Sequence, residues 1–461
     1  MEREHSTVTI GEAPPAARGP AALFAVLTAE EPLSLAASTR HLLADVAEVE
    51  VRRGDGRAVH RSGGRLVVSL PDKRLSAPHA RLGLEGGFWH VADLGSKNGV
   101  LVNGARADRA VLGDGDVLEL GYSFFVFRAA TPLQVTDRPD VSAAEPPARQ
   151  RGLLSLNPSL EGQFAELDRV AATRLTVLIG GETGTGKELV ARAVHRLSGR
   201  SGPLVSINCA ALSKTLLEAE LFGFKKGSFS GAAHDRAGLI TASDGGSLFL
   251  DEIAELPLEG QAALLRVLQE REVMPIGATR AEPVDLRLLA ATHYDLDAAV
   301  DQGRFRADLR MRLGGARIHL PPLRTRREDL GILTASLAGR LAPERDDMTL
   351  AHQTARLLFA RTWPGNVREL ERALELAIVG SAEGRIVMTS APAPPPARIE
   401  EAPSEPARLR ASDQQRRSEL DVLMREHGGN VTVVARRLGK AREQVYRWIK
   451  RLGIDPARYR D

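Results

Sequence analysis

The feature that most constrains the fold is a glycine-rich segment, GETGTGKE, placed between an apolar run and an amphipathic stretch. The preceding LTVLIG is typical of a buried strand, and the following ELVARAVHRL has helical spacing. Glycines in such a loop let successive backbone N–H groups face a phosphate chain, and the helix N-terminus adds its positive end. This strand, loop and helix together predict a parallel α/β sheet that binds a nucleotide. A plain glycine-rich turn is the minor alternative.

The loop supplies most of the expected nucleotide-binding residues, with Lys187 reaching the outer phosphates. Glu188 stands where Ser or Thr is usual as a magnesium ligand, and it is a second candidate ligand beside the acidic residue described next. The residues predicted to bind nucleotide within the loop are Gly181, Glu182, Thr183, Gly184, Thr185, Gly186, Lys187 and Glu188.

An acidic pair ends a second apolar run, GGSLFLDE. On its own such a pair is usually a solvated strand end, but behind a phosphate loop it favours ATP hydrolysis. We expect Asp251 to hold Mg²⁺ against the nucleotide and Glu252 to orient and deprotonate the attacking water. ATP and Mg²⁺ are therefore the predicted cofactors.

Proline- and alanine-rich stretches divide the 461 residues into domains. Short apolar runs punctuated by Gly, Asn and Asp predict an all-β sandwich at the N-terminus, and alternating strand and helix patterns predict a central α/β domain. Helical stripes predict an all-α C-terminal domain. The expected boundaries are 21–129 for the sandwich, 130–152 for a linker, 153–390 for the α/β domain, 391–412 for a second linker and 413–461 for the C-terminal domain.

Composition excludes several classes of protein. Apolar residues make up 43% and charged residues 26%, which is an ordinary globular balance. The sequence contains no run of about 18 uncharged apolar residues, the length that a membrane-spanning helix needs. No secretory signal is evident, and the single cysteine, Cys209, excludes an internal disulfide. We expect a cytoplasmic protein that does not contact membranes. The net charge of +3 is slight, so affinity for nucleic acid has to be local.

Residues 153–390 resemble the AAA+ domain of bacterial enhancer-binding proteins, the ATPases that activate sigma-54 RNA polymerase. The resemblance runs through SINCAAL, ELFGFKKGSFSGA, GGSLFLDEI, GRFRADLRMRL, LPPLRTRREDL and WPGNVREL. It implies an AAA+ P-loop ATPase with a helical lid, and a homo-oligomeric ring with ATP between subunits. Whether the ring has six or seven members stays open.

The segment GSFSGA resembles the family's GAFTGA loop, whose phenylalanine engages sigma-54. Phe229 is kept, while Ser228 and Ser230 replace Ala and Thr. An aromatic residue between glycines in a polar loop also favours a contact point over a core position. The implied sigma-54 contacts are Gly227, Ser228, Phe229, Ser230, Gly231 and Ala232.

The resemblance also implies roles outside the loops. Asn208 would hold Glu252 in an idle state, and Arg368 would read the phosphates from the lid. Arg306 and Arg312 would reach the nucleotide of a neighbouring subunit, although an ordinary basic helix face is the alternative.

The first sensor strand ends in Thr292 and His293, where the family has Thr and Asn. A histidine can still bond the hydrolytic water or the γ-phosphate, so we include both residues among those that bind nucleotide.

The C-terminal segment GNVTVVARRLGKAREQVYRWIKRLGI has the stripes of two helices joined by a tight turn, and it is rich in Lys and Arg. It resembles a Fis-type helix-turn-helix, which implies binding to double-stranded DNA at an upstream activator site. Basic helices that merely pair with acidic neighbours are the alternative. The residues expected to reach the major groove are Arg442, Gln444, Tyr446, Arg447 and Lys450.

The N-terminal domain resembles a forkhead-associated (FHA) domain, a sandwich that binds phosphothreonine, in RSGGRLVVSLPDKRLSAPHARL and WHVADLGSKNGVLVNG. The resemblance implies that Arg61 and Ser76 contact phosphate and that Asn98 holds the peptide backbone, with His79 structural. Arginine and neutral loop donors suit a phosphate. The implied partner is a phosphothreonine protein or a Ser/Thr kinase.

These features together predict a sigma-54-dependent transcriptional regulator. It would bind upstream DNA, use ATP to remodel sigma-54 RNA polymerase for promoter opening, and be gated by its FHA domain. The alternatives are a DNA-binding regulator with an impaired ATPase, for which His293 is the warning sign, and an AAA+ remodeller of another protein.

Overall fold

The computed structural model describes residues 20–131, 138–145, 152–211, 214–228, 232, 234–381 and 384–388, and near the C-terminus 420, 423–424, 427, 433–434 and 437–438. The chain divides into two compact units, Met1–Pro392 and Ala393–Asp461. Among the described residues, no helix has the length and apolar character needed to cross a membrane.

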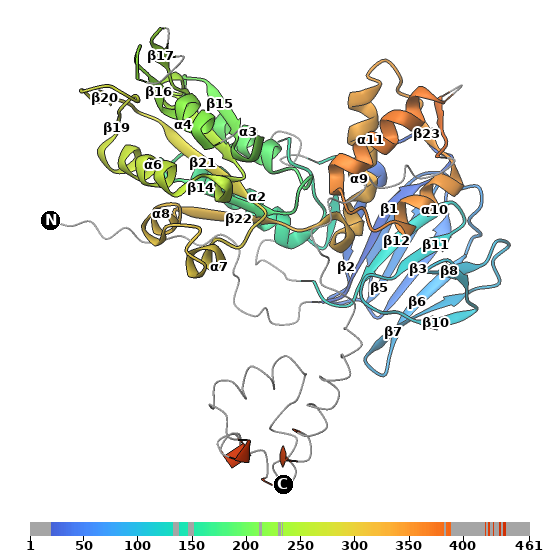
Figure 1. Ribbon diagram of the computed structural model, residues 1–461. Coiled ribbons are helices and arrows are strands. Elements are labelled where there is room, and N and C mark those ends of the chain that lie inside the picture. The colour runs from blue at the N-terminus through green and yellow to red at the C-terminus, as the bar shows by residue number, and fades with distance from the viewer. Residues whose placement is uncertain are drawn as a thin grey trace. The chain divides into compact units, whose positions relative to one another are not determined.

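The N-terminal domain is a sandwich of two sheets, drawn in blue and cyan in Figure 1. The first sheet has the order β13-β2-β1-β12-β11-β8-β9, with strands Asp140–Ser142 (β13), Thr39–Leu42 (β2), Ala22–Thr28 (β1), Ser123–Arg128 (β12), Val117–Leu120 (β11), Val100–Val102 (β8) and Ala105–Arg106 (β9). The second has the order β10-β7-β6-β3-β5-β4, with strands Arg109–Val111 (β10), Phe88–Asp93 (β7), Ala80–Glu85 (β6), Glu48–Arg53 (β3), Arg65–Leu70 (β5) and Ala58–Ser62 (β4).

Strands β1 and β12 are buried on both faces. Because side chains alternate along a strand, Leu23 and Phe125 enter the core between the sheets, while Phe24 and Phe124 point to the opposite face and join a second core. The first sheet of the sandwich is therefore covered on its outer side as well.

The central domain is built on a five-stranded parallel sheet of order β15-β18-β21-β14-β22. Its strands are Leu204–Asn208 (β15), Ser247–Asp251 (β18), Arg287–Thr292 (β21), Val177–Gly181 (β14) and Ala316–Leu320 (β22). The helices of the domain are Pro158–Ala171 (α2), Lys187–Leu197 (α3), Lys214–Phe222 (α4), Leu239–Ala242 (α5), Leu258–Glu270 (α6), Leu296–Asp301 (α7) and Ala307–Arg312 (α8). Two small hairpins pair Gly223–Phe224 (β16) with Arg236–Ala237 (β17), and Glu272–Val273 (β19) with Glu282–Pro283 (β20).

A helical lid follows the sheet, drawn in orange in Figure 1. It consists of Leu330–Leu341 (α9), His352–Ala360 (α10) and Asn366–Val379 (α11), with a short parallel pair, Thr349–Leu350 (β23) and Arg385–Ile386 (β24). Short 3-10 turns, Leu323–Thr325 (η4) and Arg327–Asp329 (η5), connect the sheet to the lid. Trp363 is 1% exposed and anchors the lid core.

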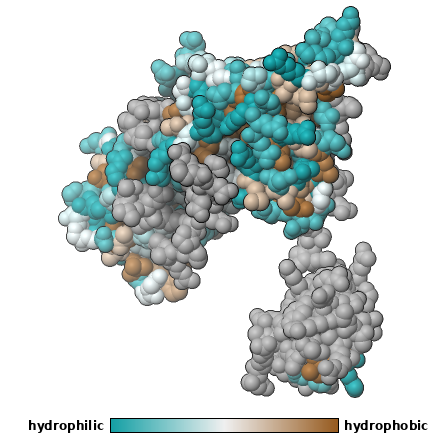
Figure 2. All heavy atoms as spheres, turned by 90° about the vertical axis from the view of Figure 1, so that its left-hand side faces the viewer, coloured by the Kyte–Doolittle hydropathy of each residue, from teal (hydrophilic) through white to brown (hydrophobic). Residues whose placement is uncertain are grey.

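The expected fold class is confirmed for an all-β N-terminal domain and a central α/β domain with a helical lid. On the face shown in Figure 2, hydrophilic residues predominate among those described and apolar residues form small separate patches. In the C-terminal unit, Leu420, Met424 and Val434 are buried. The expected DNA-contacting residues Arg442, Gln444, Tyr446, Arg447 and Lys450 lie outside the described residues, so the helix-turn-helix stays a prediction.

Candidate functional site

The glycine-rich loop joins β14 to α3 at the carboxyl edge of the parallel sheet. Gly184 has φ +81°, and a Cβ there would lie 2.2 Å from the carbonyl oxygen of Gly365 in the lid, so only glycine fits. The lid also holds the loop by hydrogen bonds, since the Arg368 N–H donates to the Gly184 carbonyl at 3.2 Å. Loop and lid therefore form one site.

A cavity of about 620 Å³ opens at this edge between the sheet and the lid. It is lined by ten of the residues expected to bind or hydrolyse nucleotide: Thr183, Gly184, Gly186, Lys187, Glu188, Asn208, Asp251, Glu252, His293 and Arg368. A second cavity of about 210 Å³ adjoins it through shared residues, among them Gly186 and Leu337, and has a largely apolar lining that suits a nucleotide base.

Lys187 and Glu252 face each other at the centre of the large cavity. The Lys187 Nζ lies 3.2 Å from Glu252 Oε1 and donates to the Gly181 carbonyl at 2.9 Å. His293 holds the other carboxylate oxygen, with Nδ1 at 2.6 Å and its backbone N–H at 3.2 Å from Oε2. The departure from the family's asparagine thus places an imidazole directly on the candidate general base.

Two expected partners differ from the sequence-based prediction. Asn208 was expected to hold Glu252, but its Nδ2 lies 3.4 Å from Asp251 Oδ2, because the parallel register of β15 and β18 pairs Asn208 with Asp251. Thr292 is buried, and its hydroxyl accepts a hydrogen bond from the Tyr294 N–H, so it shapes the turn that presents His293.

Of the two carboxylates considered as magnesium ligands, Asp251 fits the role and Glu188 fits it less well. Asp251 Oδ1 is buried and has no hydrogen-bond partner among the described residues. Burial and the neighbouring Glu252 charge raise the pKa of Asp251, and a bound cation would offset both effects. Glu188 is less available, because Arg192 Nη2 donates to its carboxylate at 2.6 Å on an exposed helix face.

The arginines expected to act on a neighbouring subunit do not line the large cavity of their own subunit. Arg306 is exposed and pairs with Asp308 at 2.7 Å, and Arg312 is exposed and donates to the Leu268 carbonyl at 3.0 Å. Arg310 is buried against Asp297 and belongs to the fold. This distribution is compatible with a role in trans for Arg306 and Arg312, which stays a prediction.

Sequence reasoning missed side chains that hold the loop from the segment after β22. Arg324 pairs with Glu182 at 2.6 Å, which together with Asn366 lowers the pKa of that carboxyl group. Arg326 donates to the Thr185 carbonyl at 3.1 Å. Arg324 and Arg326 lie in the motif LPPLRTRREDL, and Asn366 lies in WPGNVREL. Both motifs can be recognised from the sequence, but the loop residues that these side chains contact cannot.

At one end of the sandwich, Ser76 and Asn98 lie in neighbouring loops. The Lys97 N–H donates to Ser76 Oγ at 3.1 Å, and Asn98 Nδ2 donates to the Arg74 carbonyl at 2.6 Å. His79 is fully buried and joins the two loops, since its Nδ1 accepts from the Ser76 N–H and its Nε2 contacts the Gly99 carbonyl. Burial lowers the pKa of His79, in keeping with a structural role.

The structure does not bring Arg61 to this end. Arg61 pairs with Leu66 across the β4–β5 hairpin, whereas Ser76 follows the far end of β5. Its guanidinium donates to the Leu42 carbonyl and forms an ion pair with Asp140 at 3.0 Å. The arginine beside Ser76 is Arg53, which ends β3, is exposed, and donates its backbone N–H to the Ser76 carbonyl at 2.8 Å.

The expected sigma-54 contact loop is only partly described. Gly227, Ser228 and Ala232 are described, and the Gly227 N–H donates to the Ala232 carbonyl at 2.9 Å, which closes the base of the loop. Phe229, Ser230 and Gly231 lie outside the described residues.

Comparisons with known proteins match three segments of the chain to described families. Residues 153–319 match the sigma-54 interaction domain, residues 56–121 the FHA domain, and residues 324–405 the AAA+ ATPase lid domain.

Similar curated proteins are transcriptional regulators. The chain is 43% identical over 315 residues to the acetoin catabolism regulatory protein of Cupriavidus necator, covering 66% of this chain and 47% of that protein. It is 43% identical over 310 residues to the transcriptional regulatory protein ZraR of Klebsiella oxytoca, covering 65% of this chain and 68% of ZraR. It is 41% identical over 319 residues to the regulatory protein AtoC of Escherichia coli, covering 66% and 68%. The chain thus spans about half the length of the first of these relatives.

Among solved structures, NtrX from Brucella abortus in complex with ATP is 30% identical, with a TM-score of 0.47 over 66% of this chain and 69% of NtrX.

Proposed function

The chain belongs to the family of transcriptional regulators that carry a sigma-54 interaction domain, and on this premise we propose that it uses ATP hydrolysis to activate transcription by sigma-54 RNA polymerase. Its central domain is an AAA+ ATPase domain with its lid. The observation that carries the proposal is the cavity in which Lys187, Asp251 and Glu252 converge below the lid.

The residues of the cavity divide the chemistry among them. Lys187 leaves the Gly181 carbonyl and Glu252 to bind the outer phosphates, which frees one oxygen of Glu252 to accept a proton from water. Asp251 Oδ1 would hold Mg²⁺, which when bound neutralises phosphate charge. Backbone N–H groups of the loop and the Arg368 guanidinium hold the nucleotide between sheet and lid.

The regulatory input is proposed to be a phosphothreonine bound at the Ser76 end of the sandwich. Ser76 Oγ and Asn98 supply neutral donors there. Arg74 and Lys97 place positive charge in the same loops, and Arg53 adds charge from the adjoining end of β3. Arg53 takes the phosphate-binding role first assigned to Arg61, since Arg61 is engaged by Asp140.

The remaining parts of the proposal rest on sequence resemblance. The C-terminal helices bind an upstream DNA site, the loop from Gly227 to Ala232 contacts sigma-54, and subunits assemble into a ring in which Arg306 and Arg312 reach the adjacent nucleotide.

The test uses the purified chain in an ATPase assay and in sigma-54-dependent transcription. Lys187→Ala is expected to abolish nucleotide binding, and Glu252→Gln to keep binding while lowering turnover at least about a hundredfold. Phe229→Ala should keep ATP turnover and lose promoter opening. Turnover unchanged in Glu252→Gln would refute the catalytic assignment. Turnover without transcription would favour a remodeller of another protein, and transcriptional repression without turnover a regulator with an impaired ATPase.

The sensor is tested with phosphothreonine peptides and the full chain. Arg53→Ala is expected to abolish binding, while Arg61→Ala, the matched control, keeps it. Equal binding of unphosphorylated peptides would exclude the phosphothreonine role.

A further inference from the structure

The sandwich and the lid share one hydrophobic core. Val26 of β1 and Phe124 of β12 lie in the same buried cluster as the lid residues Leu330, Ile332, Leu337, Leu358, Phe359 and Trp363. Phe124 stacks on Phe359 with ring centroids 5.1 Å apart. At Gly331 a Cβ would lie 1.8 Å from the Val26 carbonyl oxygen, so helix α9 and strand β1 touch backbone to backbone. The outer face of the first sheet is therefore sealed by the lid.

Hydrogen bonds and ion pairs frame this core. The Glu30 N–H donates to the Leu350 carbonyl at 2.9 Å, so the chain after β1 runs alongside β23 of the lid. Glu119, which is 4% exposed, accepts from Arg356 at 2.6 Å and contacts His352 at 2.9 Å. These contacts lower the pKa of Glu119 although burial alone would raise it.

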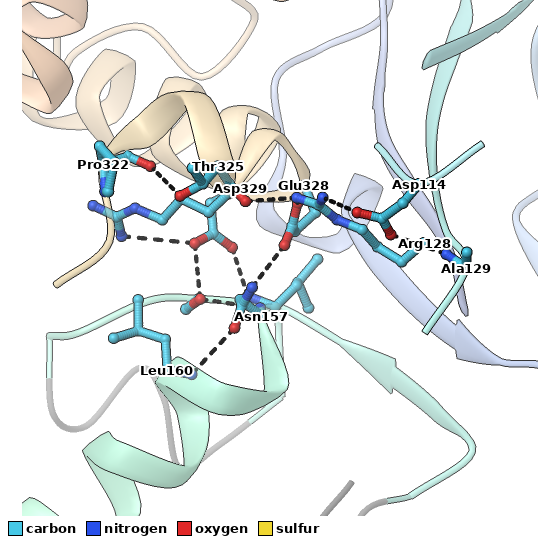
Figure 3. Close-up of polar contacts among 12 residues, drawn as sticks. Asp114, Arg128, Ala129, Asn157, Leu160, Pro322, Thr325, Glu328 and Asp329 are labelled. Atoms are coloured by element: carbon cyan, nitrogen blue, oxygen red, sulfur yellow. Dashed lines mark hydrogen bonds and ion pairs between the residues drawn. The ribbon is translucent and has the colours of Figure 1, made fainter. Parts of the chain in front are cut away.

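A network of hydrogen bonds and ion pairs links the same interface to the central domain, as Figure 3 shows. Arg128, at the end of β12, donates through Nη2 to Glu328 Oε2 and to the Thr325 carbonyl, both at 2.6 Å. Glu328 is 1% exposed, and its Oε1 accepts from Asn157 Nδ2 at 2.8 Å. Asn157 caps helix α2 by accepting from the Leu160 N–H at 3.2 Å.

This network of polar contacts continues to the phosphate-binding loop. Asp329 is fully buried and accepts from the Ser155 hydroxyl and the Leu156 N–H, each at 2.8 Å. Arg326 is 4% exposed, lies 3.7 Å from Asp329, and donates to the Thr185 carbonyl at 3.1 Å. The sandwich is thus connected to the loop by the Arg128–Glu328 ion pair, the peptide bond that joins Glu328 to Asp329, and the contacts of Arg326 with Asp329 and the Thr185 carbonyl.

We propose that the FHA sandwich and the lid form one permanent body, and that Arg128 is a positioning residue for the nucleotide. It acts through the adjacent Glu328 and Asp329, and then through Arg326, on the Thr185 carbonyl. The proposal rests on the proposed nucleotide binding. Separating the sandwich from the lid would expose their shared apolar core to water, which costs free energy. A ligand can shift the equilibrium between docked and separated domains only by the difference in its affinity for the two states. A phosphopeptide bound at the Ser76 end of the sandwich therefore acts on the sandwich and the lid as one body, and Arg74 of that end lies over Tyr122, which contacts the lid residue His352.

The first experiment measures the affinity of the full chain for a fluorescent ATP analogue, together with the KM and kcat of ATP hydrolysis. Arg128→Ala is expected to raise the Kd and the KM about fivefold or more with kcat changed less than about twofold, and Arg128→Lys to restore part of the affinity. Arg109→Ala is the matched control. Arg109 and Glu85 form an exposed ion pair, and both lie on the second sheet of the sandwich, whereas Arg128 lies on the first. Wild-type affinity in Arg128→Ala would overturn the positioning role, whereas a wild-type chain that binds no nucleotide would refute the proposed function itself.

The second experiment locks the interface covalently and tests the permanent body without any change at Arg128. Pro32 and Thr349 face each other in an isolated antiparallel bridge between the sandwich and the lid, a geometry that suits a disulfide after substitution of both by Cys. A permanent body predicts the same ATP turnover and nucleotide affinity before and after reduction. Loss of turnover on oxidation, restored by reductant, would show that the sandwich has to undock and would overturn the proposal.

Discussion

Asp140→Asn tests where the structure has placed Arg61. Asp140 lies on β13 and is bound by the Arg61 guanidinium and by His41 Nδ1 at 2.8 Å. Burial would raise the pKa of Asp140, but the hydrogen bonds and charges of His41 and Arg61 outweigh it and lower the pKa from 3.8 to about 2. At about 1.4 kcal/mol for each pH unit, this difference corresponds to about 2.5 kcal/mol of stability.

The Asp140 side chain is 32% exposed, and water screens its interactions with Arg61 and His41. We therefore expect these interactions to stabilise the fold by about 1 kcal/mol. A carboxyl group with a lowered pKa stabilises the fold above its unfolded pKa, so the contribution is present at neutral pH and is lost as the pH falls from about 4 to about 2.

Hydrogen exchange measured by mass spectrometry reports this locally, in peptides that cover β2 and β13. At pH 7 the variant is expected to exchange about fivefold faster there, and the difference from wild type should shrink below about pH 4 and close at about pH 2. Asp301→Asn is the control, since Asp301 is exposed and distant in sequence from both strands. If exchange in Asp140→Asn matched wild type while Arg61→Ala abolished phosphopeptide binding, Arg61 would be a phosphate ligand and our placement would be wrong.

Three further predictions concern the nucleotide site and the shared core. Gly184→Ala is expected to weaken ATP binding about tenfold or more, because of its positive φ and the Gly365 carbonyl 2.2 Å from a Cβ; unchanged affinity by titration would contradict this. His293→Ala should lower kcat about tenfold with little change in KM, because Glu252 loses a hydrogen bond of 2.6 Å, and steady-state kinetics with an equal kcat would remove His293 from the reaction. Phe359→Ala, at a side chain 5% exposed, should lower the free energy of unfolding by about 3 kcal/mol; a change below about 1 kcal/mol in urea denaturation would argue against a tightly packed sandwich–lid core.

The nucleotide site could be predicted from sequence because its parts are local. The loop from Gly181 to Lys187 is contiguous, and its strand and helix define where it lies. Asp251 and Glu252 end a neighbouring buried strand, and parallel strands bring their carboxyl ends to one edge.

The proposed phosphopeptide site shows where such reasoning fails. Arg61 and Arg53 both precede β5 in sequence, and motif order alone favoured Arg61. Only the hairpin register of β4 and the parallel pairing of β3 with β5 decide which arginine lies beside Ser76. Register is set by hydrogen bonding between strands, which no single strand specifies by itself.

What the sequence by itself determined is the set of elements and the chemistry of each contiguous motif: a phosphate-binding loop, an acidic strand end, a sandwich and a lid. Only the tertiary structure decided which surfaces meet. Strands β1 and β12 are apolar on both faces, yet nothing in their pattern says that a lid covers the outer one. The contact between Arg128 and Glu328 joins residues 200 positions apart, because packing selects partners by shape and charge in three dimensions and spacing along the chain does not encode them.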